Sequence, residues 1–444
     1  MIKKFILLSL VASQLMISCS SDDSSENTKP ESELSLEEQI AELTKKSYSE
    51  LTPDQQKLKL EAEANEMLTQ LDKTKSSGAI EALENLSRLL DLSSVDIFNG
   101  KNDNEAEDIL NVSGVYGIYT WNNAGQKWDK TASSTELKFV FPAKKSQTTN
   151  NASFSSKSTS SDIKIDITDS YDWESGVETN DHIFLPLTAD AILTIDSKEA
   201  ASFNQTATYS NKKQVPDEFA YKMVLNDGYT WEMSSKKGAS NTGKASLTYN
   251  GKTLINFNAG SSANIDALID NDELIQYRGK ANGLFQLMDN FVVVADTDLA
   301  TAAADKAAMD KTVPYPEYNS VTYYEDLNAY YKKIADAKVA NYNKNNKLIL
   351  VSKKDGTKIA DIVQHSEKGY SYTTIQPTWV ADANYSGGGY WSYTNTKEIT
   401  VQYYDAVDYL KFNDKTEVSM ETYFSAGFSK FEAKFEDFIA AFEK

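Results

Sequence analysis

One short segment of the chain concentrates side chains that could do chemistry. Residues 166–182 hold seven acidic or imidazole side chains beside Tyr171, and four of the carboxylates follow one another closely: Asp166, Asp169, Asp172 and Glu174. Calcium takes about six to eight oxygen ligands, so we predict that these four carboxylates bind calcium if the segment has a function. Two carboxylates could instead flank a glycosidic bond as acid and base. The spacing fits no EF-hand loop, and in a chain this acidic a solvated loop is the competing interpretation.

A second candidate site combines aromatic rings with glycines. Trp379, Tyr385, Tyr390 and Trp391 surround the run Gly387–Gly389. A glycine-rich loop that displays aromatic rings is suited to stacking on sugar faces or to anchoring a protein partner. We therefore predict that these four side chains bind a ligand. The competing interpretation is a long hairpin whose rings fold back onto a sheet.

Several catalytic patterns are absent from the sequence. It contains no Gly-x-Ser-x-Gly nucleophile motif, and His182 and His365 are its only histidines. Residues 238–244 match the beginning of a phosphate-binding loop, but Ala245 stands where Ser or Thr would bind magnesium, and a strand pattern follows instead of a helix. We interpret this segment as a hairpin tip, assign no catalytic residue, and expect a binding or structural protein rather than an enzyme.

The charge and the cysteine content exclude further classes of function. The chain carries 65 acidic and 45 basic residues, a formal net charge of −20. Such a protein is repelled by phosphate backbones and anionic lipid surfaces, which argues against a nucleic-acid partner and against adsorption to a membrane by charge. Cys19 is the only cysteine, so no disulfide forms within the chain and buried apolar side chains must stabilise the fold.

The first 18 residues have the form of an export signal. Lys3 and Lys4 precede a mostly apolar run at residues 5–17, which is shorter than a membrane-spanning helix requires. Residues 19–34 are polar and show no apolar periodicity, so we expect a flexible tether there.

The residues Leu-Met-Ile-Ser-Cys at 15–19 resemble the lipobox of bacterial lipoproteins, with Met16 where Leu is commonest. The resemblance implies cleavage before Cys19, acylation of that residue with chains such as palmitate, and a lipid anchor in the outer membrane. Ser20-Ser21-Asp22-Asp23 is similar to the tract that sends lipoproteins of Bacteroidota-type bacteria to the cell surface. An ordinary polar linker is the competing interpretation of that tract.

The elements that must position the candidate sites fall into three sections. Residues 35–92 contain three amphipathic helical patterns, the first opened by a Ser35–Glu38 capping box. Residues 110–295 alternate polar and apolar side chains with the period of two typical of half-buried strands, which predicts a first β-rich domain. Ser-, Asn- and Lys-rich runs at 144–161 and 234–243 are expected to be exposed loops or long hairpin tips. Residues 320–444 are predicted to form a second, α+β domain.

The last section ends in a regular aromatic stripe. Six phenylalanines recur three or four residues apart, at positions 424, 428, 431, 435, 438 and 442, which predicts an amphipathic helix packed on a sheet. The opposite face is mixed in charge, whereas a helix on a membrane surface would be basic. The predicted fold class is therefore α+β: a short helical section, an antiparallel β-rich body and a closing amphipathic helix.

These patterns together predict a lipoprotein anchored in the outer membrane, and displayed on the cell surface if the Ser/Asp tract acts as an export signal. We expect it to bind an apolar ligand, a glycan or a protein partner without catalysis. The alternative is a glycan hydrolase that uses the carboxylates of residues 166–182. Calcium is the one cofactor that the sequence suggests.

Overall fold

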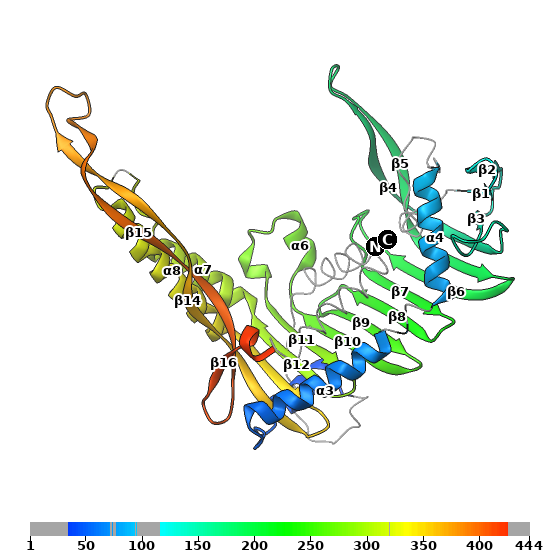
Figure 1. The fold of residues 1–444 in the computed structure, drawn as a ribbon, viewed down its shortest axis with the longest axis horizontal. Coiled ribbons are helices and arrows are strands. Elements are labelled where there is room, and N and C mark those ends of the chain that lie inside the picture. The colour runs from blue at the N-terminus through cyan, green and yellow to red at the C-terminus, as the bar shows by residue number, and fades with distance from the viewer. Residues whose placement is uncertain are drawn as a thin grey trace.

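The computed structural model describes residues 34–71, 73, 77–93, 95, 116–318 and 320–424, without the side chains of residues 71, 166–172, 177–183 and 395. The described residues form one open sheet of 16 strands (Figure 1). The strands are β1 (Gly117–Asn122), β2 (Lys127–Thr131), β3 (Leu137–Phe141), β4 (Ala152–Asp172), β5 (Val177–Ile195), β6 (Lys198–Thr208), β7 (Glu218–Leu225), β8 (Tyr229–Lys236), β9 (Asn241–Tyr249), β10 (Lys252–Ser261), β11 (Lys280–Leu287), β12 (Phe291–Asp298), β13 (Asn346–Ser352), β14 (Thr357–Ala381), β15 (Gly389–Lys411) and β16 (Glu417–Ser419).

The sheet is a meander. Each strand from β3 to β16 pairs antiparallel with its neighbour in the sequence, and β1 pairs in parallel with β3 and antiparallel with β2. This confirms the antiparallel β-rich body. β12 pairs with β13 from Phe291 to Thr297, so the strands of both predicted β sections belong to the same sheet. The proposed division into two domains stays a prediction.

Several turns follow directly from the sequence. Asn250 and Gly251 have φ of 49° and 76° and connect β9 to β10, with Tyr249 opposite Lys252, as an Asn-Gly pair favours. Gly356, with φ of 65°, ends the turn between β13 and β14. The run at 144–161 is only partly a loop, because its second half lies in β4. Ala152 and Phe154 alternate there into the core, which the surrounding serines conceal in the sequence.

Successive turns of a meander lie at opposite ends of the strands, so they form two rows along two opposite sides of the sheet. The β5–β6, β7–β8, β9–β10, β11–β12 and β13–β14 turns share one edge, which we call the helix-side edge. The β4–β5 and β14–β15 turns lie at the other, which we call the ribbon-side edge. This placement decides where the two candidate sites are.

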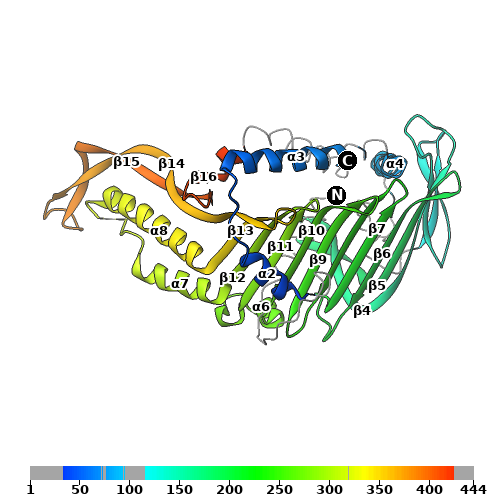
Figure 2. The same cartoon turned by 90° about the horizontal axis from the view of Figure 1, so that it is seen from below.

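Helices cover parts of the sheet (Figures 1 and 2). Those in the described ranges are α2 (Leu36–Thr44), α3 (Pro53–Leu71), α4 (Gly78–Leu92), α6 (Ile265–Asp270), α7 (Leu299–Thr312) and α8 (Tyr323–Asn345), with a short 3-10 turn at Ile275–Tyr277. The predicted capping box at α2 is present, since Ser35 Oγ accepts from the Glu38 N–H at 3.2 Å and Glu38 Oε2 accepts from the Ser35 N–H at 2.6 Å.

α3 runs along the helix-side edge (Figure 2). Its 19 residues make a helix of about 28 Å, close to the roughly 29 Å that separates four consecutive turns on that edge. Lys59 Nζ lies 2.8 Å from Asp355 Oδ2 in the β13–β14 turn, and the Tyr229 hydroxyl at the start of β8 donates to the Gln70 carbonyl. α3 therefore ties together turns that are far apart in the sequence.

The largest core lies where α4 and the end of α3 meet β1 and β3 to β10. Its fully buried members include Met67, Leu86, Phe139, Phe154 and Leu193. β12 and β13 are covered on both faces, because alternate side chains face α2 on one side and α3 on the other. Val292, Val294, Ile349 and Val351 pack with Ile40 and Leu43, whereas Phe291 and Leu350 pack with Leu60 and Tyr423.

Two hairpins continue beyond the sheet as two-stranded ribbons (Figure 1). β5 pairs with β6 only from Thr188 to Ile195, but its pairing with β4 continues outward to Val177. β14 leaves β13 at Ile362 and pairs with β15 as far as Ala381. The first is the β4–β5 ribbon and the second the β14–β15 ribbon.

Residues 420–424 are also helical, so the structure describes a helix that reaches the first phenylalanine of the predicted stripe, and the remainder of the predicted closing helix lies outside the described residues. The Phe424 ring itself lies 5.1 Å from that of Tyr423 and packs against the core that contains Leu410 and Phe412. The packing of the remaining phenylalanines stays a prediction.

Candidate functional site

The outer end of the β14–β15 ribbon gathers the four aromatic residues that the sequence singles out. Trp379 and Trp391 are opposite each other in the register, and their rings meet edge-on with centroids 5.2 Å apart and planes at 69°. The rings of Tyr385 and Tyr390 lie 4.9 Å apart. Trp379, Tyr385 and Tyr390 are 38%, 52% and 39% exposed, so these rings do not fold back into a core.

The turn backbone holds the two ring pairs in place. Gly388 has φ of 75°, and a Cβ added to Gly389 would lie 2.4 Å from the Val380 carbonyl oxygen and 2.7 Å from the Trp379 ring. The indole of Trp379 therefore rests on the Gly389 backbone. Asp382 Oδ1 accepts from both the N–H and the Nδ2 of Asn384 at 2.9 Å, which closes the loop that carries Tyr385. We call this region, residues 379–391, the aromatic tip.

A tyrosine cluster lies about halfway along the same ribbon, where α8 packs on it. The rings of Tyr331 and Tyr403 lie 4.3 Å apart, and Tyr370 and Tyr372 each lie 6.2 Å from Tyr403. Sequence reasoning missed this cluster. The available signal was the spacing of Tyr370 and Tyr372, which places both on one face of a strand.

Two tyrosine hydroxyls of α8 at this site, those of Tyr323 and Tyr331, remain protonated at neutral pH. A hydrogen bond with Tyr315, at 3.2 Å, raises the pKa of Tyr323 to about 12, with burial as a second cause. Burial, followed by the hydrogen bond to Tyr403, raises the pKa of Tyr331. These two hydroxyls are therefore neutral hydrogen-bonding groups beside aromatic faces.

Two asparagines of α8 bind the unpaired edges of the β14–β15 ribbon. Asn343 Nδ2 donates to the Gln364 carbonyl and its Oδ1 accepts from the Gln364 N–H, both at 2.8 Å. Asn328 does the same on the other strand, since Nδ2 donates to the Thr400 carbonyl at 2.8 Å and Oδ1 accepts from the Gln402 N–H at 2.7 Å. Each amide replaces the peptide group of a neighbouring strand. The ribbon is thereby fixed against α8, and its edges are partly protected from strand addition.

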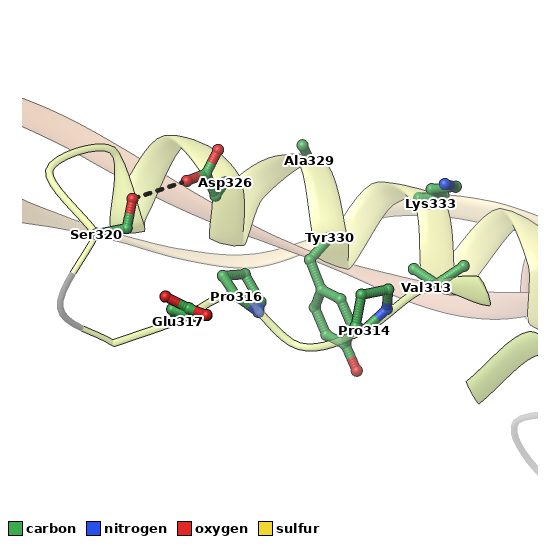
Figure 3. Close-up of a pocket in the computed structure, with 9 residues that line it drawn as sticks. All are labelled: Val313, Pro314, Pro316, Glu317, Ser320, Asp326, Ala329, Tyr330 and Lys333. Carbon is green, nitrogen blue, oxygen red and sulfur yellow. Dashed lines mark hydrogen bonds between the residues drawn. The ribbon is translucent and has the colours of Figure 1, made fainter. Parts of the chain in front are cut away.

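A pocket of about 400 Å³ lies between α8 and the loop that precedes it (Figure 3). Pro314, Pro316 and the Tyr330 ring form its apolar side, and Glu317 and Lys333 lie at its margin. Ser320 Oγ donates to Asp326 Oδ2 at 3.2 Å, so this carboxylate is already engaged by the loop. The pocket borders the tyrosine cluster through Tyr330, whose ring lies 5.6 Å from that of Tyr331.

A second open groove, of about 420 Å³, crosses the sheet face from β6 to β10. It is lined largely by small polar and amide side chains such as Asn204, Ser234 and Asn256, and by the Lys222–Glu232 ion pair at 2.6 Å. Ala220, Met233 and Ala245 add apolar surface beside these polar groups, so the groove is mixed in character and does not favour one class of ligand.

The predicted calcium ligands lie at the outer end of the β4–β5 ribbon. The register places Asp166 opposite His182 and Asp172 opposite Val177. The side chains of Asp166, Asp169 and Asp172 are outside the described part of the chain, and Glu174 lies exposed in the turn. Among the described side chains, no group of three or more His, Cys, Asp or Glu is arranged to hold a metal ion. Calcium binding by these residues stays a prediction.

The structure also describes the positions of the phosphate-loop-like segment and of His365. The phosphate-loop-like segment is only partly a hairpin tip, because β8 ends at Lys236 and β9 begins at Asn241, so residues 241–244 lie in a strand. His365 lies on β14, about half exposed, with Nε2 2.6 Å from Glu417 Oε2. Cys19 lies outside the described residues.

Comparison of the chain with known protein families, with curated proteins and with solved structures finds no match. Within the described ranges, every helix is too short or too polar to cross a membrane.

Proposed function

We propose that this protein is a non-catalytic glycan-binding lipoprotein, attached to the outer membrane through acylated Cys19. The observation that carries the proposal is the aromatic tip, where two pairs of partly exposed rings lie at the turn that ends a long ribbon. The tether at residues 19–34 would separate the sheet from the membrane surface.

The chemistry of the aromatic tip suits a sugar. One face of a pyranose presents C–H groups, which stack on an aromatic ring, and its rim carries hydroxyls that need hydrogen-bonding partners. Trp379 and Tyr385 offer ring surface, and Asp382 and Asn384 offer polar groups in the same turn. The net charge of −20 disfavours polyanionic chains, so we propose a neutral polysaccharide as the ligand.

Native affinity gels test this proposal. The soluble chain from residue 34 onward is run through gels cast with soluble starch, mannan, xylan or mixed-linkage glucan, and retardation is compared with a gel that lacks polymer. We expect at least one polymer to retard the protein, and we expect the Trp379→Ala/Trp391→Ala double variant to migrate freely. Tyr277→Ala removes a ring of similar exposure, 40%, away from both ribbons and serves as the matched control.

Two results would overturn the glycan proposal: no retardation by any of the four polymers, or equal retardation of the double variant and the wild type. Release of reducing ends from a retarding polymer, lost in Asp172→Asn or Glu174→Gln, would instead support the hydrolase. The anchor is tested separately, because Cys19→Ser in the full chain should move the protein from the membrane fraction to the soluble fraction. Unchanged fractionation would contradict acylation.

A further inference from the structure

The six tryptophans of the chain divide into two groups of three. Trp121 is 3% exposed in the main core, and Trp128 and Trp231 pack against that core. The other three lie at the outer ends of the two ribbons: Trp379 and Trp391 in the aromatic tip, and Trp173 in the β4–β5 turn. Trp173 is 88% exposed. Tryptophan is highly buried on average and is enriched at the centres of binding sites, so its exposure at both ribbon ends indicates contact with a ligand.

The topology places both ribbon ends on the same side of the sheet. The β4–β5 and β14–β15 turns belong to the ribbon-side edge, opposite α3, and Figure 1 shows both ribbons rising from that edge with the sheet between them. β5 and β14 are nine strands apart in the sheet order, which corresponds to roughly 43 Å between the bases of the ribbons. A short oligosaccharide cannot bridge such a distance, whereas a polysaccharide chain can.

We propose that Trp173 is a second contact site for the same glycan, so that the protein binds long polysaccharides at two points. The inference rests on the proposed function. Binding at the aromatic tip holds the polymer near the second ribbon, which makes the contact with Trp173 an intramolecular step. Two linked contacts of this kind raise the apparent affinity by about 100-fold or more over either contact alone.

The test compares intact polymer with short oligosaccharides. A polymer that retards the protein is used whole and as short oligosaccharides prepared from it by partial hydrolysis, and Kd is measured for both by calorimetry. For Trp173→Ala we expect at least tenfold weaker binding of the intact polymer and unchanged binding of the short oligosaccharides. Trp173→Phe keeps an aromatic face and should restore most of the affinity. Leu187→Ala, at a 39% exposed position lower on the same ribbon, is the control.

The outcomes separate the two proposals. Equal affinity of Trp173→Ala and wild type for the intact polymer would overturn the second contact and leave the aromatic tip as the glycan site. An equal loss for polymer and oligosaccharide would also overturn it, because the residue would then act on a single site. If none of the polymers binds the wild type, both proposals fall.

Discussion

The amide groups of Asn343 and Asn328 allow a local test of how α8 holds the β14–β15 ribbon. Asn343→Ala removes one acceptor and one donor, each 2.8 Å from a Gln364 backbone atom. A hydrogen bond of this kind contributes about 0.5–1.5 kcal/mol, and water replaces part of it at a surface site. We therefore expect the free energy of local opening at the Gln364 amide to fall by about 1.4 kcal/mol. This corresponds to roughly tenfold faster hydrogen exchange at that amide.

The assay is hydrogen–deuterium exchange by mass spectrometry on overlapping peptides that isolate this amide. Asn343→Asp keeps the acceptor for the Gln364 N–H but removes the donor to its carbonyl, so the exchange should accelerate less than in the alanine variant. Asn and Asp have similar helix propensities, so this comparison also removes the propensity difference between Asn and Ala. Lys338→Ala, at an exposed position on the same helix, is the control.

Unchanged exchange at the Gln364 amide in Asn343→Ala would refute the reasoning, because water would then satisfy the strand edge as well as the asparagine does. Asn328→Ala should produce the same acceleration at the Gln402 amide. The two asparagines are 15 positions apart on the helix, about 22 Å, so the effects of the two variants should be additive.

Three further predictions concern stability and the aromatic tip. The hydrogen bond from Lys411 holds the pKa of Glu417 below its ordinary value. The ionised carboxylate therefore stabilises the fold at neutral pH, and this stabilisation is lost as pH falls through the lowered pKa. Glu417→Gln should reduce the acid sensitivity of the thermal midpoint. Gly389→Ala should displace the Trp379 ring, changing the near-ultraviolet circular dichroism and weakening polymer retardation while the thermal midpoint moves little. Leu86→Ala, at a fully buried site, should lower the free energy of unfolding by about 2–5 kcal/mol in urea titrations.

Two of these predictions have a matched control variant, and the third has an outcome that would contradict it. Gly387→Ala alters the same loop at a position with room for a Cβ, and an equal loss of retardation there would argue against the specific contact at Gly389. Leu92→Ala, 55% exposed on the same helix as Leu86, should cost little, and equal destabilisation by both would show that α4 is not packed as described. An unaltered pH profile in Glu417→Gln would show that its ion pair contributes nothing measurable.

Much of the local structure follows from the sequence. The Ser35–Glu38 capping box, the Asn250-Gly251 turn and the alternating segment Leu137–Phe141 follow from the sequence because each depends on residues close together in the chain. The aromatic tip was also visible as a candidate, since the glycine run and its flanking rings occupy one hairpin. Neither the sequence nor the structure shows what those rings bind, so their ligand is a proposal.

Other features depend on contacts between distant parts of the chain. A period of two predicts strands but does not fix their order, so the union of β12 and β13 in one sheet required the tertiary structure. Three other features likewise join residues far apart in the sequence. They are the match in length between α3 and the row of turns, the tyrosine cluster, and the asparagines that bind the ribbon edges.

The sequence by itself determined the local elements and the residue types available to a site, because capping, turn formation and apolar periodicity are short-range effects. Only the tertiary structure decided which tryptophans enter the core and which lie at the ribbon ends. The physical reason is that a ring's burial depends on whether a helix or another strand reaches its face, and within the described residues both ribbons extend past the neighbouring strands of the sheet.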